Sequence, residues 1–105
     1  MNIEKFTTKF QQALSEAQSL ALGKDNQFIE PVHLLAALLN QQDGSIAPIW
    51  TASGVNVALL RNELNAELNK LPQVSGNGGD VQISRQLLNL LNLCDKLAQQ
   101  KQDKF

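Results

Sequence analysis

The sequence has few of the features that mark a secreted or nucleic-acid-binding protein. It contains one cysteine, no tyrosine and 5% aromatic residues among 105. A single cysteine cannot form an internal disulfide, so nothing points to an oxidising compartment. Nine Lys and Arg against ten Asp and Glu give a net charge of −1. That balance excludes the broad basic surface that a nucleic acid requires.

Long apolar runs and a secretory signal are also missing. Runs such as Leu34–Leu39 have about six residues, whereas a membrane-spanning helix needs about 20. The opening residues, MNIEKF, lack the basic-then-apolar layout of a secretory signal. We therefore expect one small cytoplasmic domain that binds neither membranes nor nucleic acid.

Apolar residues recur at spacings of three and four, which predicts an all-α fold. The first helix is expected from about Ile3 or Thr7 to Leu22, with Gly23 as its left-handed C-terminal cap. Four more helices are expected: Pro31–Asn40 ended by Asp43-Gly44, Ser45–Ser53 closed by Gly54, one capped by Asn56 that stops before Pro72, and one capped by Ser84 that runs to about Gln102. The glycine-rich stretch Gln73–Asp80 is expected to be a flexible connector.

A shift of the sequence by 77 positions aligns the first expected helix with the last. Thr7 then meets Ser84 and Leu14 meets Leu91, so cap meets cap and inward face meets inward face. We predict a duplicated four-helix bundle, although two leucine-rich helices can also match by coincidence. Its first repeat covers about 1–71, a connector 72–82, and the start of a second repeat 83–105. The bundle is therefore expected to be truncated after the first helix of the second repeat, in a fragment of a longer protein.

Three stretches carry a family likeness: NQFIEPVHLLAALL at Asn26–Leu39, LPQVSGNGGDVQIS at Leu71–Ser84, and LNLCDKLAQQKQDKF at Leu91–Phe105. They resemble the amino-terminal (Clp N) domain of AAA+ unfoldases, in particular that of the ClpB family of bacterial disaggregases. Gln102 departs from the glycine that this family usually has before the acidic residue.

The resemblance implies a duplicated bundle without catalytic activity of its own. Such a domain is expected to bind unfolded or aggregated polypeptide before an ATPase ring threads it. The longer protein is then expected to use ATP and magnesium, to form a homohexamer and to work with chaperones of the 70-kDa heat-shock type. No cofactor is expected in this chain.

The residues themselves give no pattern of an enzyme. His33, in the first turn of a helix, is expected to pack or cap rather than to catalyse or to bind a metal. Cys94 is expected on the inward face, where apolar surroundings keep a thiol inert. The cluster Gly76, Gly78 and Gly79 lacks the Lys-Ser/Thr of a phosphate loop.

A stripe of leucines on the last helix is the candidate binding surface. Leu90, Leu93 and Leu97 recur at spacings of three and four beside the inward face. Either missing helices of the second repeat cover this stripe, or it lines a groove for an extended or unfolded peptide. The resemblance adds Thr7 and Asp103 as a polar rim, although Thr7 is also an expected N-cap.

Two other functions stay open at this point. An adaptor-docking domain of a Clp-type unfoldase that feeds a protease needs a charged patch specific for one folded partner, and the sequence shows none. A structural spacer would bind neither adaptors nor unfolded clients.

Overall fold

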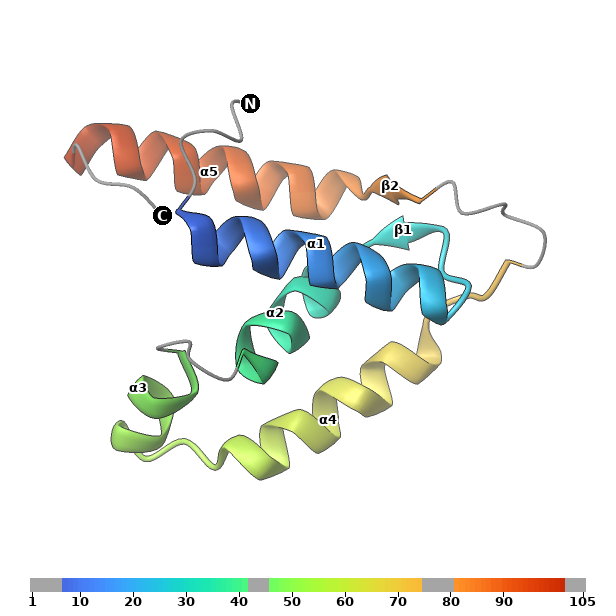
Figure 1. Ribbon diagram of the computed structural model, residues 1–105, viewed down its shortest axis with the longest axis horizontal. Helices are drawn as coiled ribbons and strands as arrows, with labels where there is room; N and C mark the ends of the chain where they lie inside the picture. Colours follow the sequence, from blue (N-terminus) through green and yellow to red (C-terminus); the bar gives the residue numbers. More distant parts are fainter. Residues whose placement is uncertain (1–6, 42–45, 75–80, 102–105) are drawn as a thin grey trace.

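The computed structural model describes residues 7–41, 46–74 and 81–101, and most of them lie in helices. Within these residues the helices are α1 (Thr8–Gly23), α2 (Pro31–Asn40), α3 (Ile46–Ala52), α4 (Val57–Lys70) and α5 (Arg85–Lys101). Two-residue strands, β1 (Phe28–Ile29) and β2 (Gln82–Ile83), precede α2 and α5 (Figure 1). The predicted all-α class is confirmed, with one short strand ladder that the periodicity did not predict.

The helices begin where polar side chains can cap them. The side-chain oxygens of Thr7, Asn56 and Ser84 each accept a hydrogen bond from the backbone N–H three residues further on, at 3.1 to 3.2 Å. Such a bond satisfies one of the N–H groups that a helix start leaves without a partner. Pro31 is the first residue of α2, where its missing N–H is not needed. These four starts were predicted from the sequence and are confirmed.

The end of α1 differs from the prediction, because Gly23 is not its left-handed residue. That conformation belongs to Asp25, with φ 55°. The N–H of Asn26 donates to the oxygen of Ala21 at 2.9 Å, and that of Asp25 donates to Leu22 at 3.1 Å, which is the Schellman arrangement. An aspartate tolerates this conformation better than most residues with a side chain. The chain therefore turns two residues later than predicted, and Asn26 is buried at the end of α1.

The two strands pair in parallel and join the N-terminal half of the chain to α5. Phe28 lies opposite Gln82 and Ile29 opposite Ile83. The N–H of Ser84 also donates to the oxygen of Ile29 at 3.1 Å. Figure 1 shows α5 alongside α1 and running in the opposite direction.

The connector after α4 is fixed at its first residues. Gln73 forms an antiparallel bridge with Asn26, and the N–H of Val74 donates to the oxygen of Asp25 at 2.8 Å. The predicted flexibility is therefore wrong for Gln73 and Val74, because hydrogen bonds tie them to the turn between α1 and β1. Residues 75–80, with the three glycines, lie outside the described residues, as does the predicted end signal Asp43-Gly44.

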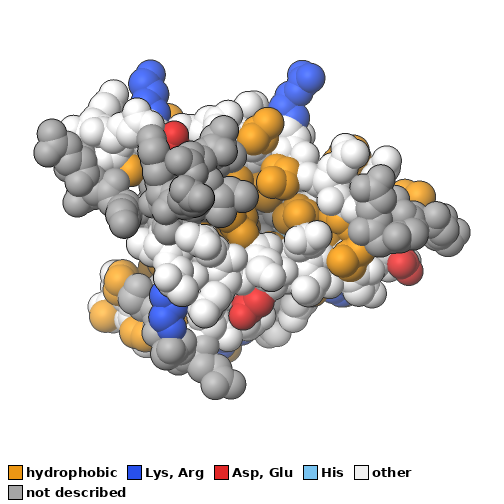
Figure 2. All heavy atoms as spheres, turned by 45° about the horizontal axis from the view of Figure 1, so that its top comes forward, with side chains coloured by type: hydrophobic (Ala, Val, Ile, Leu, Met, Phe, Trp, Pro, Cys, Tyr) orange, Lys and Arg blue, Asp and Glu red, His pale blue; other side chains and the backbone are white. Residues whose placement is uncertain are grey.

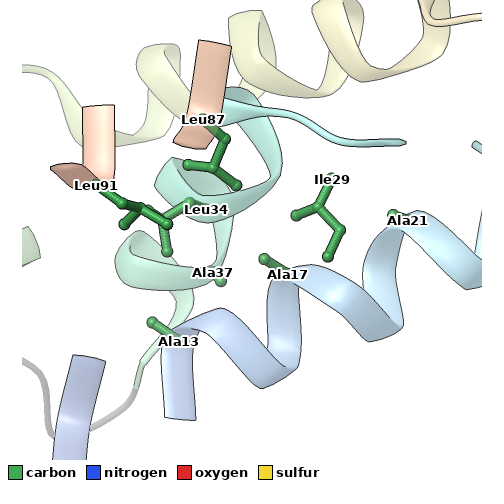
Figure 3. Close-up of a cluster of buried hydrophobic side chains, with 8 residues drawn as sticks. All are labelled: Ala13, Ala17, Ala21, Ile29, Leu34, Ala37, Leu87 and Leu91. Carbon is green, nitrogen blue, oxygen red and sulfur yellow. The ribbon is translucent and has the colours of Figure 1, made fainter. Parts of the chain in front are cut away.

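The core lies between α1, α2, β1 and α5 (Figure 3). On α1 it uses alanines four residues apart, which are fully buried and let neighbouring elements approach closely. From α5, leucine side chains point into the same cluster. Burying one leucine contributes roughly 1.5–3 kcal/mol. The buried members are Ala13, Ala17, Ala21, Ile29, Leu34, Ala37, Leu87 and Leu91.

The helices aligned by the shift of 77 do not bury their matching positions to the same depth. Ala13 of α1 is fully buried, whereas its counterpart Leu90 is 41% exposed. Conversely, Leu87 is fully buried and its counterpart Phe10 only partly so. Cys94, predicted on the inward face, is half-buried. Phe10 and Leu14 nevertheless pack against the core, as their counterparts Leu87 and Leu91 do. The two helices therefore face the core with matching positions that are buried to different depths, and they differ most at Ala13 and Leu90. The repeat itself stays a prediction.

Candidate functional site

Three leucines of α5 lie exposed on one side of the helix. Leu90, Leu93 and Leu97 are 41%, 53% and 47% exposed, and their spacings of three and four place them side by side. We call these three residues the leucine face. The neighbouring side of α5 carries Leu87 and Leu91, which lie in the core. Figure 2 looks toward the side of the molecule that carries α5 and shows hydrophobic side chains gathered there.

Of the two residues predicted as a polar rim, the structure describes one. Thr7 is exposed and caps α1. Because α1 and α5 run in opposite directions, α1 begins at the end of the molecule where the C-terminal half of α5 lies (Figure 1). The structure therefore brings Thr7 to the same end as Leu97. Asp103 lies outside the described residues.

A hollow of about 290 Å³ lies between α1 and the strand ladder. All its lining residues are uncharged, and three of them are apolar. Sequence reasoning missed this hollow because it forms only when β1 and β2 pair. The sequence feature that could have indicated it is the presence of one isoleucine, Ile29 or Ile83, in each of two short segments outside the predicted helices. The lining residues are Gln11, Leu14, Ser15, Gln18, Ile29 and Ile83.

The single histidine is fully buried at the start of α2. The backbone N–H of Glu30 donates to Nδ1 of His33 at 2.8 Å. Nδ1 must then lack a proton, so Nε2 carries it and donates to Oδ1 of Asn26, also at 2.8 Å. Burial lowers the pKa of His33 and outweighs the opposite effect of the Glu30 carboxylate. The predicted packing and capping role of His33 is confirmed.

Asn26 extends this arrangement to the connector. Its side chain is 2% exposed, and its Nδ2 donates to the carbonyl oxygen of Pro72 at 3.1 Å. One buried amide thus joins the end of α1, the start of α2 and the residues that follow α4. This link could not be predicted from the sequence, because an asparagine after a helix is most often a turn residue.

The described residues show no metal site and no membrane span. No group of three or more His, Cys, Asp or Glu side chains among them is placed to hold a metal ion. In the same part of the chain, no helix is both long and apolar enough to cross a bilayer.

Residues 5–105 match the family model of the Clp repeat (R) N-terminal domain. The match covers nearly the full chain, and the chain belongs to this family. The helical bundle and the leucine face described above are therefore those of a Clp N domain.

The relatives of this chain are chaperones. It is 55% identical to the chaperone protein ClpB of Vibrio cholerae, over 100% of this chain and 12% of that protein. It is 51% identical to ClpB of Pseudomonas putida and 40% identical to ClpB of Rickettsia bellii, with the same coverage. The chain thus spans about an eighth of the length of these curated relatives, and it is a domain of the Clp chaperone family.

A solved structure shares the fold. It comes from a study of the ATPase ClpV and the TssB-TssC sheath of type VI secretion, and it superposes with a TM-score of 0.80. The match covers 91% of this chain and 58% of the other at 20% identity, which supports the fold alone.

Proposed function

We propose that this domain binds unfolded or aggregated polypeptide on the leucine face and delivers it to the ATPase ring of a disaggregating chaperone. The observation that carries the proposal is the exposure of Leu90, Leu93 and Leu97, at 41–53%, on a helix whose adjacent side is buried in the core. An apolar surface on a firmly packed helix offers a ready contact for hydrophobic segments that folded proteins hide. Similarity to the ClpB chaperones supports this choice of ligand.

The composition of the surface suits many clients rather than one. Leucine side chains are flexible and carry no hydrogen-bonding group, so they repack against different sequences. The hollow between α1 and the strand ladder, walled in part by Leu14 and Ile83, has room for an apolar client side chain. Thr7 and Asp103 complete the proposed surface as a polar rim that binds client backbone. This mode of binding relies on apolar contacts, whereas an adaptor-docking domain would need a charged patch specific for one folded partner.

For the longer protein we propose the activity that the relatives suggest. It would be a cytoplasmic homohexamer that uses ATP and magnesium in modules outside this chain and works with chaperones of the 70-kDa heat-shock type. The domain itself then has no catalytic step; its task is to hold a client weakly enough to release it to the ring.

The test is a titration of the ¹⁵N-labelled chain with a permanently unfolded client, such as a reduced and carboxymethylated protein. We expect chemical-shift changes along α5 and at the start of α1. Leu93→Gln should weaken binding about 5- to 30-fold, which corresponds to roughly 1–2 kcal/mol of lost apolar contact.

A matched control is Leu59→Gln, because Leu59 lies on α4 and is 54% exposed, like Leu93. It should bind the client as the unmodified chain does. Shift changes confined to α4 would refute the proposed surface. A pull-down that yields one stoichiometric folded protein, and no unfolded clients, would favour an adaptor-docking domain instead.

A further inference from the structure

We propose that His33 is an acid-sensitive latch that holds the connector residues Pro72–Val74 against the turn between α1 and β1. The proposal concerns the folding of the domain and does not depend on which ligand the leucine face binds.

The connector is held at three successive residues. Pro72 accepts a hydrogen bond from Nδ2 of Asn26 at 3.1 Å, Gln73 bridges to Asn26, and Val74 donates to the oxygen of Asp25 at 2.8 Å. Two of these three contacts involve Asn26. The orientation of the Asn26 amide is in turn fixed by its Oδ1, which accepts from Nε2 of His33 at 2.8 Å.

Only the neutral form of His33 fits this site. A proton added to Nδ1 would face the N–H of Glu30, which lies 2.8 Å away and is itself a donor. Two donors cannot share that bond, and the charged ring would also lie in a fully buried position. The ring must therefore move toward water when it is protonated. Its departure removes the donor from Asn26 Oδ1 and frees the amide that holds Pro72.

The charges around the ring do not offset this effect. Glu30, at the start of α2, favours the protonated ring, whereas Lys24, at the end of α1, disfavours it. Burial is the largest influence and lowers the pKa of His33 below 6.5. The neutral ring therefore holds the latch closed at neutral pH, and the latch opens as the pH falls through this lowered pKa.

Opening of the latch would change how α5 is attached. The connector leads to β2, which pairs with β1 and continues directly into α5. When the connector is released, the two-residue ladder and the core contacts of Leu87 and Leu91 are left to hold the start of α5. Acid thus acts on the position of α5 through His33 of α2, and the proposal needs no titration of a group on α5 itself.

Hydrogen exchange followed by NMR between pH 7.5 and 5 tests the latch on the full chain. The probes are the backbone N–H groups of Glu30 and Val74, which make the bonds described above. Leu64, in the middle of α4 and away from the latch, is the internal reference. We expect the protection factors of Glu30 and Val74, relative to Leu64, to fall together by about tenfold per pH unit once the histidine begins to bind its proton.

The variant His33→Gln supplies the control, since it has a polar side chain that does not titrate in this range. Its relative protection factors should not change with pH. Three outcomes would overturn the latch: loss of protection at Glu30 while Val74 stays protected, an equal loss at Leu64, or the same pH dependence in His33→Gln. A ¹⁵N spectrum that places the neutral-state proton on Nδ1 of His33 would also overturn it, and this measurement does not require the variant to fold.

Discussion

At the scale of single residues, side-chain oxygens decide where helices begin. Thr7 and Ser84 occupy equivalent places at the starts of α1 and α5, and each accepts the N–H three residues on. Ser84 is 3% exposed, whereas Thr7 is exposed to solvent, so the same cap forms both at a buried and at an exposed position. For Thr7, capping and a place on the proposed polar rim are compatible, and substitution can separate the two.

Thr7→Ala should lower the free energy of unfolding by about 1 kcal/mol, because an N–H at the start of α1 loses its acceptor. Thr7→Ser should retain most of that stability. Urea denaturation of both variants measures the difference. Equal stability in Thr7→Ala and the unmodified chain would show that the cap contributes nothing.

Asn26 is a second residue whose side chain acts over a long sequence distance. Asn26→Ala should destabilise the domain by about 1–3 kcal/mol, because it leaves the buried Nε2 of His33 without its acceptor. Pro72 is exposed, so its carbonyl oxygen can bind water when the Asn26 amide is removed. Asn65→Ala, at an exposed position of α4, is the control and should change stability by less than about 0.5 kcal/mol. Thermal and urea unfolding should rank the two variants in this order, and similar losses would contradict the role given to Asn26.

At the scale of elements, α5 has two apolar sides with different surroundings. Leu91 is 1% exposed and packs into the core, whereas Leu93 is 53% exposed. The alignment of α5 with α1 predicted Leu91 on the inward face and Leu93 in a stripe beside that face, and the exposures agree with this difference. It left open whether further helices would cover the stripe. Burial depends on where α1 and α2 lie, which the sequence of α5 does not contain.

Substitutions on these two sides of α5 should therefore affect different properties: the stability of the domain on the buried side and client binding on the exposed side. Leu91→Ala should cost about 2–5 kcal/mol of stability, since it leaves a cavity in the core. Leu93→Ala should change stability by less than about 0.5 kcal/mol but weaken client binding. Chemical denaturation and client titration of both variants check this. A strongly destabilised Leu93→Ala would mean that this leucine packs against the domain.

The elements were predicted to different degrees. The starts of α1, α2, α4 and α5 were predicted because capping and periodicity act within a few residues. The ladder of β1 and β2 was not, since two residues carry no period. The left-handed residue was misplaced on Gly23, because a glycine is permitted that conformation without being required to adopt it.

At the scale of the whole molecule, the buried histidine links folding to pH. The pKa of His33 is lowered in the folded state, so between that value and 6.5 the unfolded chain binds more protons than the folded one. Stability is then complete above about pH 6.5 and decreases as the pH falls toward the folded pKa. The loss is up to about 1.4 kcal/mol per pH unit in that interval.

Urea denaturation at several pH values should show this decrease in the unmodified chain. His33→Gln should lack it, while the loss at more acidic pH, caused by carboxylates, remains in both. If the two stabilities stay parallel between pH 7.5 and 5, the histidine does not control the acid response.

The helices, their N-terminal caps and the family could be predicted from the amino-acid sequence, because these depend on neighbouring residues and on contiguous motifs. The sequence also placed Leu90, Leu93 and Leu97 beside the inward face of α5, although it left open whether further helices cover them. Tertiary structure alone decided the attachment of the connector, the pairing of Ile29 with Ile83 and the hydrogen bonds around His33. These features join residues far apart in the chain, and such contacts form only after the helices have packed and excluded water from the groups between them.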